Sequence, residues 1–321
     1  MSIVTLDDIA LEQFANVKVV GVGGAGCKAL NHMIDTGLEK VDFLTIDTDE
    51  ASLSNAKSVE KLQIGNTLTQ GKGTGASPDI GQQAAREERD AILDSLQGAD
   101  MVFIAAGMGG GTGAGGAPIV AEYAMETGAL VVGIVSLPLA SEGKEKRKNA
   151  EYWMEALQKH ADSILAIPCD RLQKITGRST SQDAYAMADD ISLQTVKGIS
   201  DLIAVPGLIN LDFTDVKNAL KGAGSMGYFF GESSGENAGV QAAKQAISSP
   251  LLAENIGDAR NILFNISGAS DCLSMLDVYN ALVVVQEAAP PGANIAFGAS
   301  LKDDLGNVFR VTVIATGFEK A

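Results

Sequence analysis

Residues 107–116 read GMGGGTGAGG, and this glycine run is the most informative stretch of the chain. It follows an apolar segment at 101–106 (MVFIAA), which predicts a buried strand, and precedes residues 117–125, which predict a helix. Glycine is costly to order, but it lets bare N–H groups approach a ligand. N–H groups at the start of a helix attract anions, phosphate above all. Because flexible linkers do not usually join a strand to a helix, the position predicts a phosphate-binding loop rather than a linker.

A second glycine loop lies upstream of the first. Residues 17–22 (VKVVGV) predict a short strand, and GGAG at 23–26 follows it. A helix is expected from Cys27 onward, because apolar residues recur there at helical spacing. The letters GVGGAG at 21–26 fit the pattern G-x-G-x-x-G, which is weak alone and gains weight from its strand–turn–helix context.

Composition narrows the classes of protein that fit this chain. Its 321 residues exceed the size at which one core keeps growing, which predicts two domains. The net charge of −16 argues against nucleic-acid binding and against direct contact with anionic lipid. The three cysteines (Cys27, Cys169 and Cys272) are widely spaced, which argues against a disulfide framework or a zinc site and fits a reducing cytosol. The sequence has no apolar run of about 18 residues, so we expect a soluble, cytoplasmic protein.

Strands and helices are expected to alternate from Val17 to about Pro168. Further strands are predicted at 43–47, 130–136 and 164–168, and helices at 82–97 and 144–159. Nearly continuous apolar strands between amphipathic helices are typical of a parallel α/β sheet covered on both faces. Ligands of such Rossmann-like sheets bind at the carboxyl ends of the strands, where both glycine loops fall.

The rest of the chain is predicted to form a long helix and a smaller α+β domain. Apolar residues keep a spacing of three to four from 183 to 205, and Pro206-Gly207 ends that helix. The segments expected after it are helices at 214–221 and 238–247, a glycine-rich strand region at 222–231, and strands at 261–266, 293–297 and 308–314. The last two strands flank DDLGN at 303–307, which predicts a hairpin turn. The predicted division is residues 1–182, a connecting helix at 183–205, and residues 206–321.

Two kinds of phosphate site fit the glycine loops. GVGGAG at 21–26, with Asp47 at the end of the next strand, has the spacing expected of an NAD(P)-dependent oxidoreductase. The other candidate is a nucleoside-triphosphate-binding protein outside the Walker class, since no G-x-x-x-x-G-K-[ST] occurs. A dinucleotide needs one loop for its pyrophosphate, whereas a triphosphate can use two converging loops. The second glycine loop therefore favours the triphosphate.

Segments along nearly the whole chain resemble the tubulin/FtsZ family. GGGTGAG at 109–115 resembles the signature loop of that family. The other matching segments are GVGGAG at 21–26, TIDTD at 45–49, GKGTGASP at 71–78, SLPLASEGK at 136–144, IPCDRL at 167–172, PGLINLDFTDV at 206–216 and RVTVIATGF at 310–318. The loop alone is moderately specific, but with PGLINLDFTDV it is highly specific. Within the family, the chain resembles FtsZ, the bacterial cell-division GTPase.

The resemblance implies a fold, an activity and a partner. A Rossmann-like GTPase domain would be joined by the long helix to the smaller α+β domain. Subunits would bind GTP or GDP, with Mg²⁺ or K⁺, and stack head to tail into filaments of the division ring, alongside other division proteins. GTP would be hydrolysed between subunits, so self-assembly would activate the enzyme. An FtsZ-like filament protein with weak GTPase activity is the alternative within the family.

Phosphate contacts are the first set of residues that the resemblance implies. Backbone N–H groups at 24–26 would contact phosphates, residues 109–113 would cradle the β and γ phosphates, and residues 73–76 would lie over the γ-phosphate. The full nucleotide-binding set that the resemblance implies is Gly23, Gly24, Ala25, Gly26, Lys28, Gly73, Thr74, Gly75, Ala76, Gly107, Met108, Gly109, Gly110, Gly111, Thr112, Gly113, Glu142, Lys146, Cys169, Tyr185 and Asp189.

Three residues of this set would contact the nucleoside. Glu142 would meet the ribose, Tyr185 would stack on guanine, and Asp189 would accept the N1–H and N2–H hydrogens of the base. A carboxylate suits the two donors of guanine and would repel the acceptor N1 of adenine. A solvated helix carboxylate and a core aromatic are the alternative interpretations of Asp189 and Tyr185.

Catalysis would come from the segment PGLINLDFTDV. The resemblance implies that Asn210, Asp212 and Asp215 dock onto the nucleotide of the next subunit, where the two carboxylates polarise the attacking water. Asp212 as a plain helix cap, worth about 1 kcal/mol, is the alternative. No metal site is expected from one subunit alone.

The match departs from the family pattern at a few positions. Lys28 and Cys169 stand where the family has asparagine near the nucleoside, Asp47 also replaces an asparagine, and Lys146 replaces an arginine. Lysine cannot reproduce the two-pronged hydrogen bonding of arginine, so the sequence does not fix the rate of GTP hydrolysis. Lys28, in place of an asparagine, offers a positive charge to the nucleotide. The chain stops at Ala321, before the linker and short peptide that bind membrane-anchoring partners in the family, so it leaves open whether the protein carries that tail.

Overall fold

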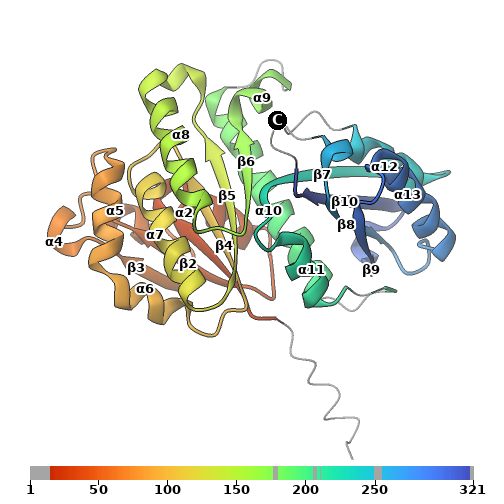
Figure 1. Ribbon diagram of the computed structural model, residues 1–321, viewed down its shortest axis with the longest axis horizontal. Coiled ribbons are helices and arrows are strands. Elements are labelled where there is room, and N and C mark those ends of the chain that lie inside the picture. Colours follow the sequence, from red (N-terminus) through yellow and green to blue (C-terminus); the bar gives the residue numbers. More distant parts are fainter. Residues whose placement is uncertain (1–14, 176–179, 205–207, 210, 249–254, 319–321) are drawn as a thin grey trace, which may run out of the picture.

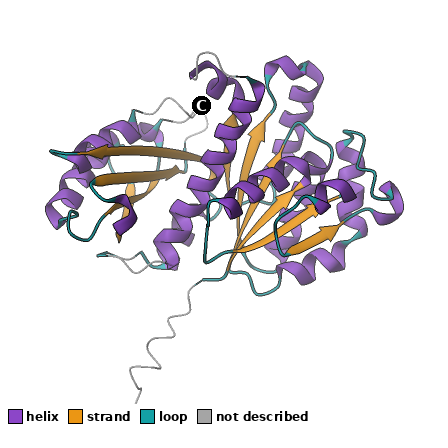
Figure 2. Ribbon diagram, turned by 180° about the vertical axis from the view of Figure 1, so that it is seen from behind, coloured by secondary structure: helices purple, strands orange, loops and turns teal. Residues whose placement is uncertain are grey.

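The computed structural model describes residues 15–175, 180–204, 208–209, 211–248 and 255–318 (Figure 1). In this part of the chain, ten strands lie side by side in the order β3-β2-β1-β4-β5-β6-β7-β10-β8-β9. A first block of six parallel strands and a second block of four are joined through β7, and the long helix α10 lies between them (Figures 1 and 2).

The six parallel strands confirm the predicted Rossmann-like sheet. They are β1 (Val17–Val22), β2 (Asp42–Asp47), β3 (Glu60–Gln63), β4 (Met101–Gly107), β5 (Leu130–Leu137) and β6 (Ser163–Pro168). Their spatial order, 3-2-1-4-5-6, is that of a doubly wound nucleotide-binding sheet. Strands β2 and β3 are added on one side of β1, and β4, β5 and β6 on the other. A ligand crevice is expected where this order reverses, between β1 and β4. Both glycine loops begin there, because they follow β1 and β4.

Helices cover both faces of this sheet, as the apolar strands predict. They are α2 (Gly23–Asp35), α3 (Glu50–Ser54), α4 (Asn66–Thr69), α5 (Pro78–Glu87), α6 (Arg89–Leu96), α7 (Thr112–Glu126), α8 (Lys144–Gln158), α9 (Cys169–Ile175), α10 (Ser181–Ala204) and α11 (Phe213–Leu220), with the 3₁₀ turn η1 (Ala140–Glu142). Phe103 of β4 packs in the core with α2, α10 and α11, whereas its neighbour Ile104 packs in the core with α5, α6, α7 and α8. Successive side chains of a strand point to opposite faces, so β4 is buried on both.

The second block contains both antiparallel and parallel strand pairs. It contains β7 (Gly224–Ser234), β8 (Asn261–Gly268), β9 (Asn294–Leu301) and β10 (Val308–Thr316), with α12 (Ala238–Ile247), α13 (Met275–Ala288), η2 (Ile256–Asp258) and η3 (Asp303–Leu305). β7 pairs with β6 only at its first two residues and then runs antiparallel to β10. Phe264 of β8 packs against α12 and α13, whereas Leu263 belongs to the core around α10. Helix α10 therefore packs against both blocks of strands.

Two predicted elements are wrong in this structure. Residues 293–297 and 308–314 do not form a hairpin, because β8 lies between β9 and β10. The helix α13, which was not predicted, carries the chain across so that β9 pairs parallel with β8 on its outer side. The single helix predicted at 82–97 is two helices, α5 and α6, which break at Glu88 (φ −103°, ψ 33°). Among the described residues, no helix is both long and apolar enough to cross a membrane.

Candidate functional site

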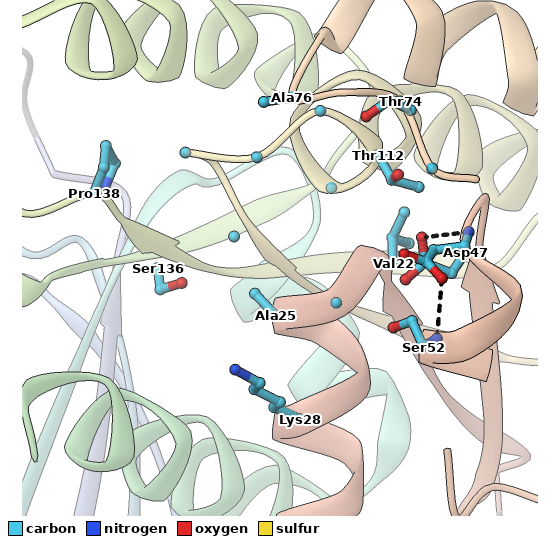
Figure 3. A pocket seen from close by; sticks show the side chains of 18 of the residues that line it. Val22, Ala25, Lys28, Asp47, Ser52, Thr74, Ala76, Thr112, Ser136 and Pro138 are labelled. Carbon is cyan, nitrogen blue, oxygen red and sulfur yellow. Dashed lines mark hydrogen bonds between the residues drawn. The ribbon is translucent and has the colours of Figure 1, made fainter. Parts of the chain in front are cut away.

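A cavity of about 880 Å³ opens at the carboxyl ends of β1, β2, β4 and β5 (Figure 3). Both glycine loops, the segment 72–76 and the first half of α10 line it. The predicted residues that line it are Gly24, Ala25, Lys28, Gly73, Thr74, Gly75, Ala76, Gly107, Gly109, Gly110, Gly111, Thr112, Gly113, Glu142, Lys146, Tyr185 and Asp189. The structure therefore brings together segments that are far apart in the sequence.

The two glycine loops touch one another at the cavity. A Cβ atom on Gly23 would lie 2.7 Å from the backbone nitrogen of Gly113. A Cβ atom on Gly107 would lie 2.7 Å from the Cβ of Ala25. Real Cβ atoms do not approach other atoms so closely, so the loops converge only because glycine occupies these positions.

Two helix N-termini open onto the same space. Helix α2 begins after Val22 and α7 after Gly111, and neither preceding residue offers a side chain to cap the helix. The first N–H groups of a helix have no partner within the helix, so they remain available to a ligand. Together with the positive end of each helix dipole, they form a strong anion-binding site.

Some glycines of the signature run serve packing rather than ligand binding. Helix α7 begins at Thr112, earlier than the predicted start at 117, so the end of the run is helical. A Cβ on Gly115 would overlap the carbonyl oxygen of Pro78, and one on Gly81 would overlap the carbonyl oxygen of Gly111. Helix α5 therefore packs directly on the backbone of α7. In contrast, a Cβ on Gly110 would meet nothing within 4 Å.

The segment 71–77 covers one side of the cavity in a run of left-handed conformations. Positive φ angles occur at Gly71, Gly73, Gly75 and Ala76. Ala76, with φ 64°, is the only non-glycine residue of these four, and such a conformation is uncommon for alanine. Thr74 is buried against Gly111. The segment is thus held against the glycine run that it faces.

A hydrogen-bonded group links η1, α8 and α10 at the other end of the cavity. The Tyr185 hydroxyl donates to Glu142, and Lys146 Nζ lies 2.8 Å from the other carboxylate oxygen of Glu142. Burial would raise the pKa of Glu142, but the hydrogen bonds from Lys146 and Tyr185 outweigh it and hold that pKa below its usual range. Glu142 is therefore ionised at neutral pH.

Asp189 is a second carboxylate at this end of the cavity. Burial raises its pKa to about 6, while His32 and Lys28 act in the opposite direction and Asp190 adds to the rise. His32 itself is hydrogen-bonded to Asp190, with Nε2 2.6 Å from Oδ1. Among the described residues, no cation is in direct contact with Asp189, which lines the cavity as an acceptor.

Two further carboxylates at the end of β2 were not predicted as ligand contacts. Asp47 and Asp49 line the cavity beside Ser52. Asp47 is buried, which raises its pKa, and its Oδ1 accepts the backbone N–H of Thr48 at 2.7 Å. Asp47 entered the sequence argument as part of the oxidoreductase fingerprint and as a replacement for the asparagine usual in the family. Its place at a strand's carboxyl end was the signal that could have identified it.

Several predicted residues do not line the cavity. Gly23, Gly26 and Met108 are buried behind the loops, and Cys169 is fully buried. Burial raises the pKa of the Cys169 thiol to about 12, so it is neutral and cannot take the role of an asparagine side chain. Asp212 and Asp215 are exposed at the start of α11, where Asp212 caps the N–H of Thr214 at 3.1 Å. Asn210 lies outside the described residues.

Comparisons with known proteins agree with this architecture. Residues 16–177 match the Tubulin/FtsZ family, GTPase domain, and residues 222–319 match the FtsZ family, C-terminal domain. An FtsZ dimer from M. jannaschii is similar over 97% of this chain and 91% of its own, with 37% identity and a TM-score of 0.91. A GTPγS-bound CetZ2 protofilament from Haloferax volcanii has a TM-score of 0.82 and 22% identity, with 95% of this chain and 94% of its own covered, which shows the shared fold alone.

Proposed function

Because the chain belongs to the tubulin/FtsZ family, we propose that it binds GTP in this cavity and hydrolyses it to GDP and phosphate. The observation that carries the proposal is the direct contact of two glycine loops, each opening onto an uncapped helix N-terminus. A dinucleotide would use one such loop, so the oxidoreductase alternative is not favoured.

The residues on the cavity wall suit the three parts of GTP. The glycine loops would hold the phosphates, and the segment 73–76 would cover the γ-phosphate. Glu142, fixed by Tyr185 and Lys146, would meet the ribose. Asp189 would accept both guanine donors in its ionised form. Tyr185 lines the same end and would stack on the base.

A magnesium ion fits the donor set beside the phosphates. Mg²⁺ is usually held by one or two carboxylates together with substrate phosphates, and Asp47 and Asp49 line the cavity. The described residues contain no group of three or more His, Cys, Asp or Glu side chains that could hold a metal alone. The ion, Mg²⁺ or K⁺, would offset phosphate charge beside carboxylates that otherwise repel it.

The catalytic carboxylates would come from a second copy of the chain. Asp212 and Asp215 do not line the cavity of their own subunit. Both are exposed on one helix end, so they are free to meet the nucleotide of a neighbour in a head-to-tail filament. The FtsZ dimer and the CetZ2 protofilament support such self-association. Positioning and electrostatics would then supply most of the rate.

The cellular role is a further part of the proposal. The similarity to FtsZ at 37% identity supports a role in bacterial cell division, in the cytoplasm at the division site and with other division proteins. Three free cysteines suit a reducing compartment. We also propose the division into residues 1–182, 183–205 and 206–321, with α10 as the connecting helix.

Calorimetric titration of the chain with GTP, ATP and NAD tests the ligand. We expect GTP to bind far more tightly than ATP, because Asp189 would face the acceptor N1 of adenine. Tight binding of NAD with none of GTP would overturn the proposal.

Hydrolysis should depend on assembly and on the charge of Asp212. We expect phosphate release per subunit to be near zero at low protein concentration and to rise above a threshold. Asp212→Asn keeps an acceptor for the helix cap but removes the charge, so it should bind GTP, fold normally and lose at least about 100-fold in turnover. Asp212→Ala should lose the cap as well, at about 1 kcal/mol of stability.

Two outcomes of this experiment contradict the shared site. Constant specific activity across dilution would show that one subunit suffices. Full turnover by Asp212→Asn would show that Asp212 is a helix cap and nothing more.

A further inference from the structure

Thr48 is a fully buried residue that the roles given so far do not use. It lies in the turn between β2 and α3 and does not line the cavity. Its hydroxyl oxygen lies 2.7 Å from the hydroxyl oxygen of Thr112, which is the first residue of α7 and lines the cavity. Among the described residues, Thr112 is the only hydrogen-bond partner of the Thr48 side chain. The pair therefore connects the interior of the protein to the cavity wall.

The backbone of Thr48 is bonded to the part of the chain that leads into the segment 71–77. Its carbonyl oxygen accepts the N–H of Gly73 at 3.3 Å and the hydroxyl of Thr69 at 3.2 Å. The next residue, Asp49, forms an antiparallel bridge with Lys72. Because these bonds hold the main chain and the side chain of threonine has few rotamers, the fold fixes the direction in which the Thr48 hydroxyl meets Thr112.

The single proton of a hydroxyl group limits what Thr112 can do for a ligand. A hydroxyl donates one hydrogen bond and has lone pairs to accept two. The oxygens of an ionised phosphate only accept, so a Thr112 hydroxyl that donates to a phosphate must be the acceptor in its bond with Thr48. Thr48 is then the donor. A hydroxyl that accepts one hydrogen bond is polarised and donates the next one more strongly.

Asp47 is the other acceptor for the proton of Thr112. Burial raises the pKa of Asp47, and hydrogen bonds, one of them from Thr112, oppose the rise. Thr112 also begins a helix whose first N–H groups have no side-chain cap, and such a terminus attracts phosphate. A nucleotide with its phosphates on the glycine loops would compete with Asp47 for this proton, and the experiment must separate the two acceptors.

We propose that Thr48 is a positioning residue whose hydroxyl donates to Thr112 and thereby directs the Thr112 proton onto a phosphate oxygen of the nucleotide. The proposal rests on the proposed GTP binding and deepens it. Thr112 is the residue that touches the phosphate, and Thr48 acts only through Thr112.

A double-mutant cycle tests whether Thr48 acts through Thr112. Titration calorimetry gives the dissociation constant of GTP for the wild type, Thr48→Val, Thr112→Val and the double variant. The protein is kept below the concentration at which it assembles, so that hydrolysis does not interfere. Valine has nearly the shape of threonine but no hydroxyl group. Thr48→Ser keeps the hydroxyl and tests for rescue.

Thr45 supplies a matched control three residues upstream, on β2. Its hydroxyl lies 2.7 Å from that of Ser58, and both residues are buried, but neither lines the cavity. Thr45→Val therefore removes a buried hydroxyl pair of the same kind that has no contact with the cavity wall. Thermal unfolding should show a similar fall in melting temperature for Thr45→Val and Thr48→Val, since each leaves one buried hydroxyl without its partner.

Thr112→Val should weaken GTP binding by roughly tenfold or more, the range of a hydrogen bond to a charged group. Thr48→Val should weaken it by roughly threefold or more, because Thr112 is then neither oriented nor polarised. The double variant should bind GTP no more weakly than Thr112→Val, since Thr48 has nothing left to position. Thr48→Ser and Thr45→Val should both bind GTP within about twofold of the wild type.

Losses that add in the double variant would show that Thr48 acts apart from Thr112 and would overturn the inference. Unchanged affinity in Thr112→Val would place its proton on Asp47 and overturn it as well. A loss in Thr45→Val equal to that in Thr48→Val would reduce the effect to stability. Failure of the wild type to bind GTP at all would instead overturn the proposed function, and the inference with it.

Discussion

Asp189 carries the clearest pH dependence in the molecule. The charges of His32, Lys28 and Asp190 act on its side chain, yet burial dominates and raises its pKa to about 6. A carboxyl with a raised pKa is protonated at a higher pH than usual. Below about pH 6 Asp189 therefore becomes a donor and no longer accepts both guanine hydrogens.

We expect GTP affinity to be constant above pH 7 and to fall below pH 6, by up to about tenfold per pH unit. Titration calorimetry from pH 5 to 8 measures this. Asp189→Asn is the control, because it cannot titrate and leaves the pair of His32 and Asp190 in place. The phosphates of GTP titrate equally in both experiments, so the difference between the two profiles reports Asp189. Parallel profiles would show that Asp189 does not contact the base.

At the scale of the element, the glycine run combines a ligand loop with a packing surface. Gly110 faces the cavity with open space around it, whereas Gly115 lies inside α7 against the backbone of α5. Both have φ values that alanine can adopt. The two positions therefore separate the two functions of one motif.

Gly115→Ala should lower the free energy of unfolding by about 3 kcal/mol, because the new methyl group forces α5 and α7 apart. Gly110→Ala should change it by no more than about 0.5 kcal/mol. Urea unfolding of the nucleotide-free protein measures both. We expect Gly110→Ala to weaken GTP binding instead, since its methyl group enters the cavity. Equal stability of the two variants would show that the α5–α7 contact relaxes freely.

At the scale of the whole molecule, an ion pair joins α10 to the four-stranded block. Asp201 of α10 and Lys302, which follows β9, are 2.8 Å apart with side chains 18% and 19% exposed. Removal of one partner leaves the other charge partly buried. The pair therefore couples the central helix to the four-stranded block.

Lys302→Met should destabilise the protein by about 1–2 kcal/mol, and a double-mutant cycle with Asp201→Asn should return a coupling of about 1 kcal/mol. The exposed pair Lys57–Asp35 is the matched control, where about 0.5 kcal/mol or less is expected. Thermal unfolding of the single and double variants supplies both values. A coupling at Asp201–Lys302 no larger than that of the control would show that the pair does not hold the helix to the sheet.

The sequence determined what depends on local pattern. Apolar strands at 17–22 and 101–106, each followed by glycine and a helix, predicted the parallel sheet and a phosphate site at its carboxyl edge, and the sheet is confirmed. The long helix was also predicted within two residues of α10. These features follow from periodicity and backbone freedom, which neighbouring residues set. Helix α13 has a comparable local signal, the capping box of Ser274 and Asp277.

Tertiary structure alone decided what depends on distant partners. The turn at 303–307 favours a hairpin locally, but β10 pairs with β8, and β9 pairs with β8 on its other side. Likewise, no local pattern shows that Gly115 meets Pro78, that Cys169 is buried, or that Lys28 and Asp189 share one cavity. Such contacts join residues far apart in the chain, and they exist because the packed sheet holds its strand ends and helix ends together.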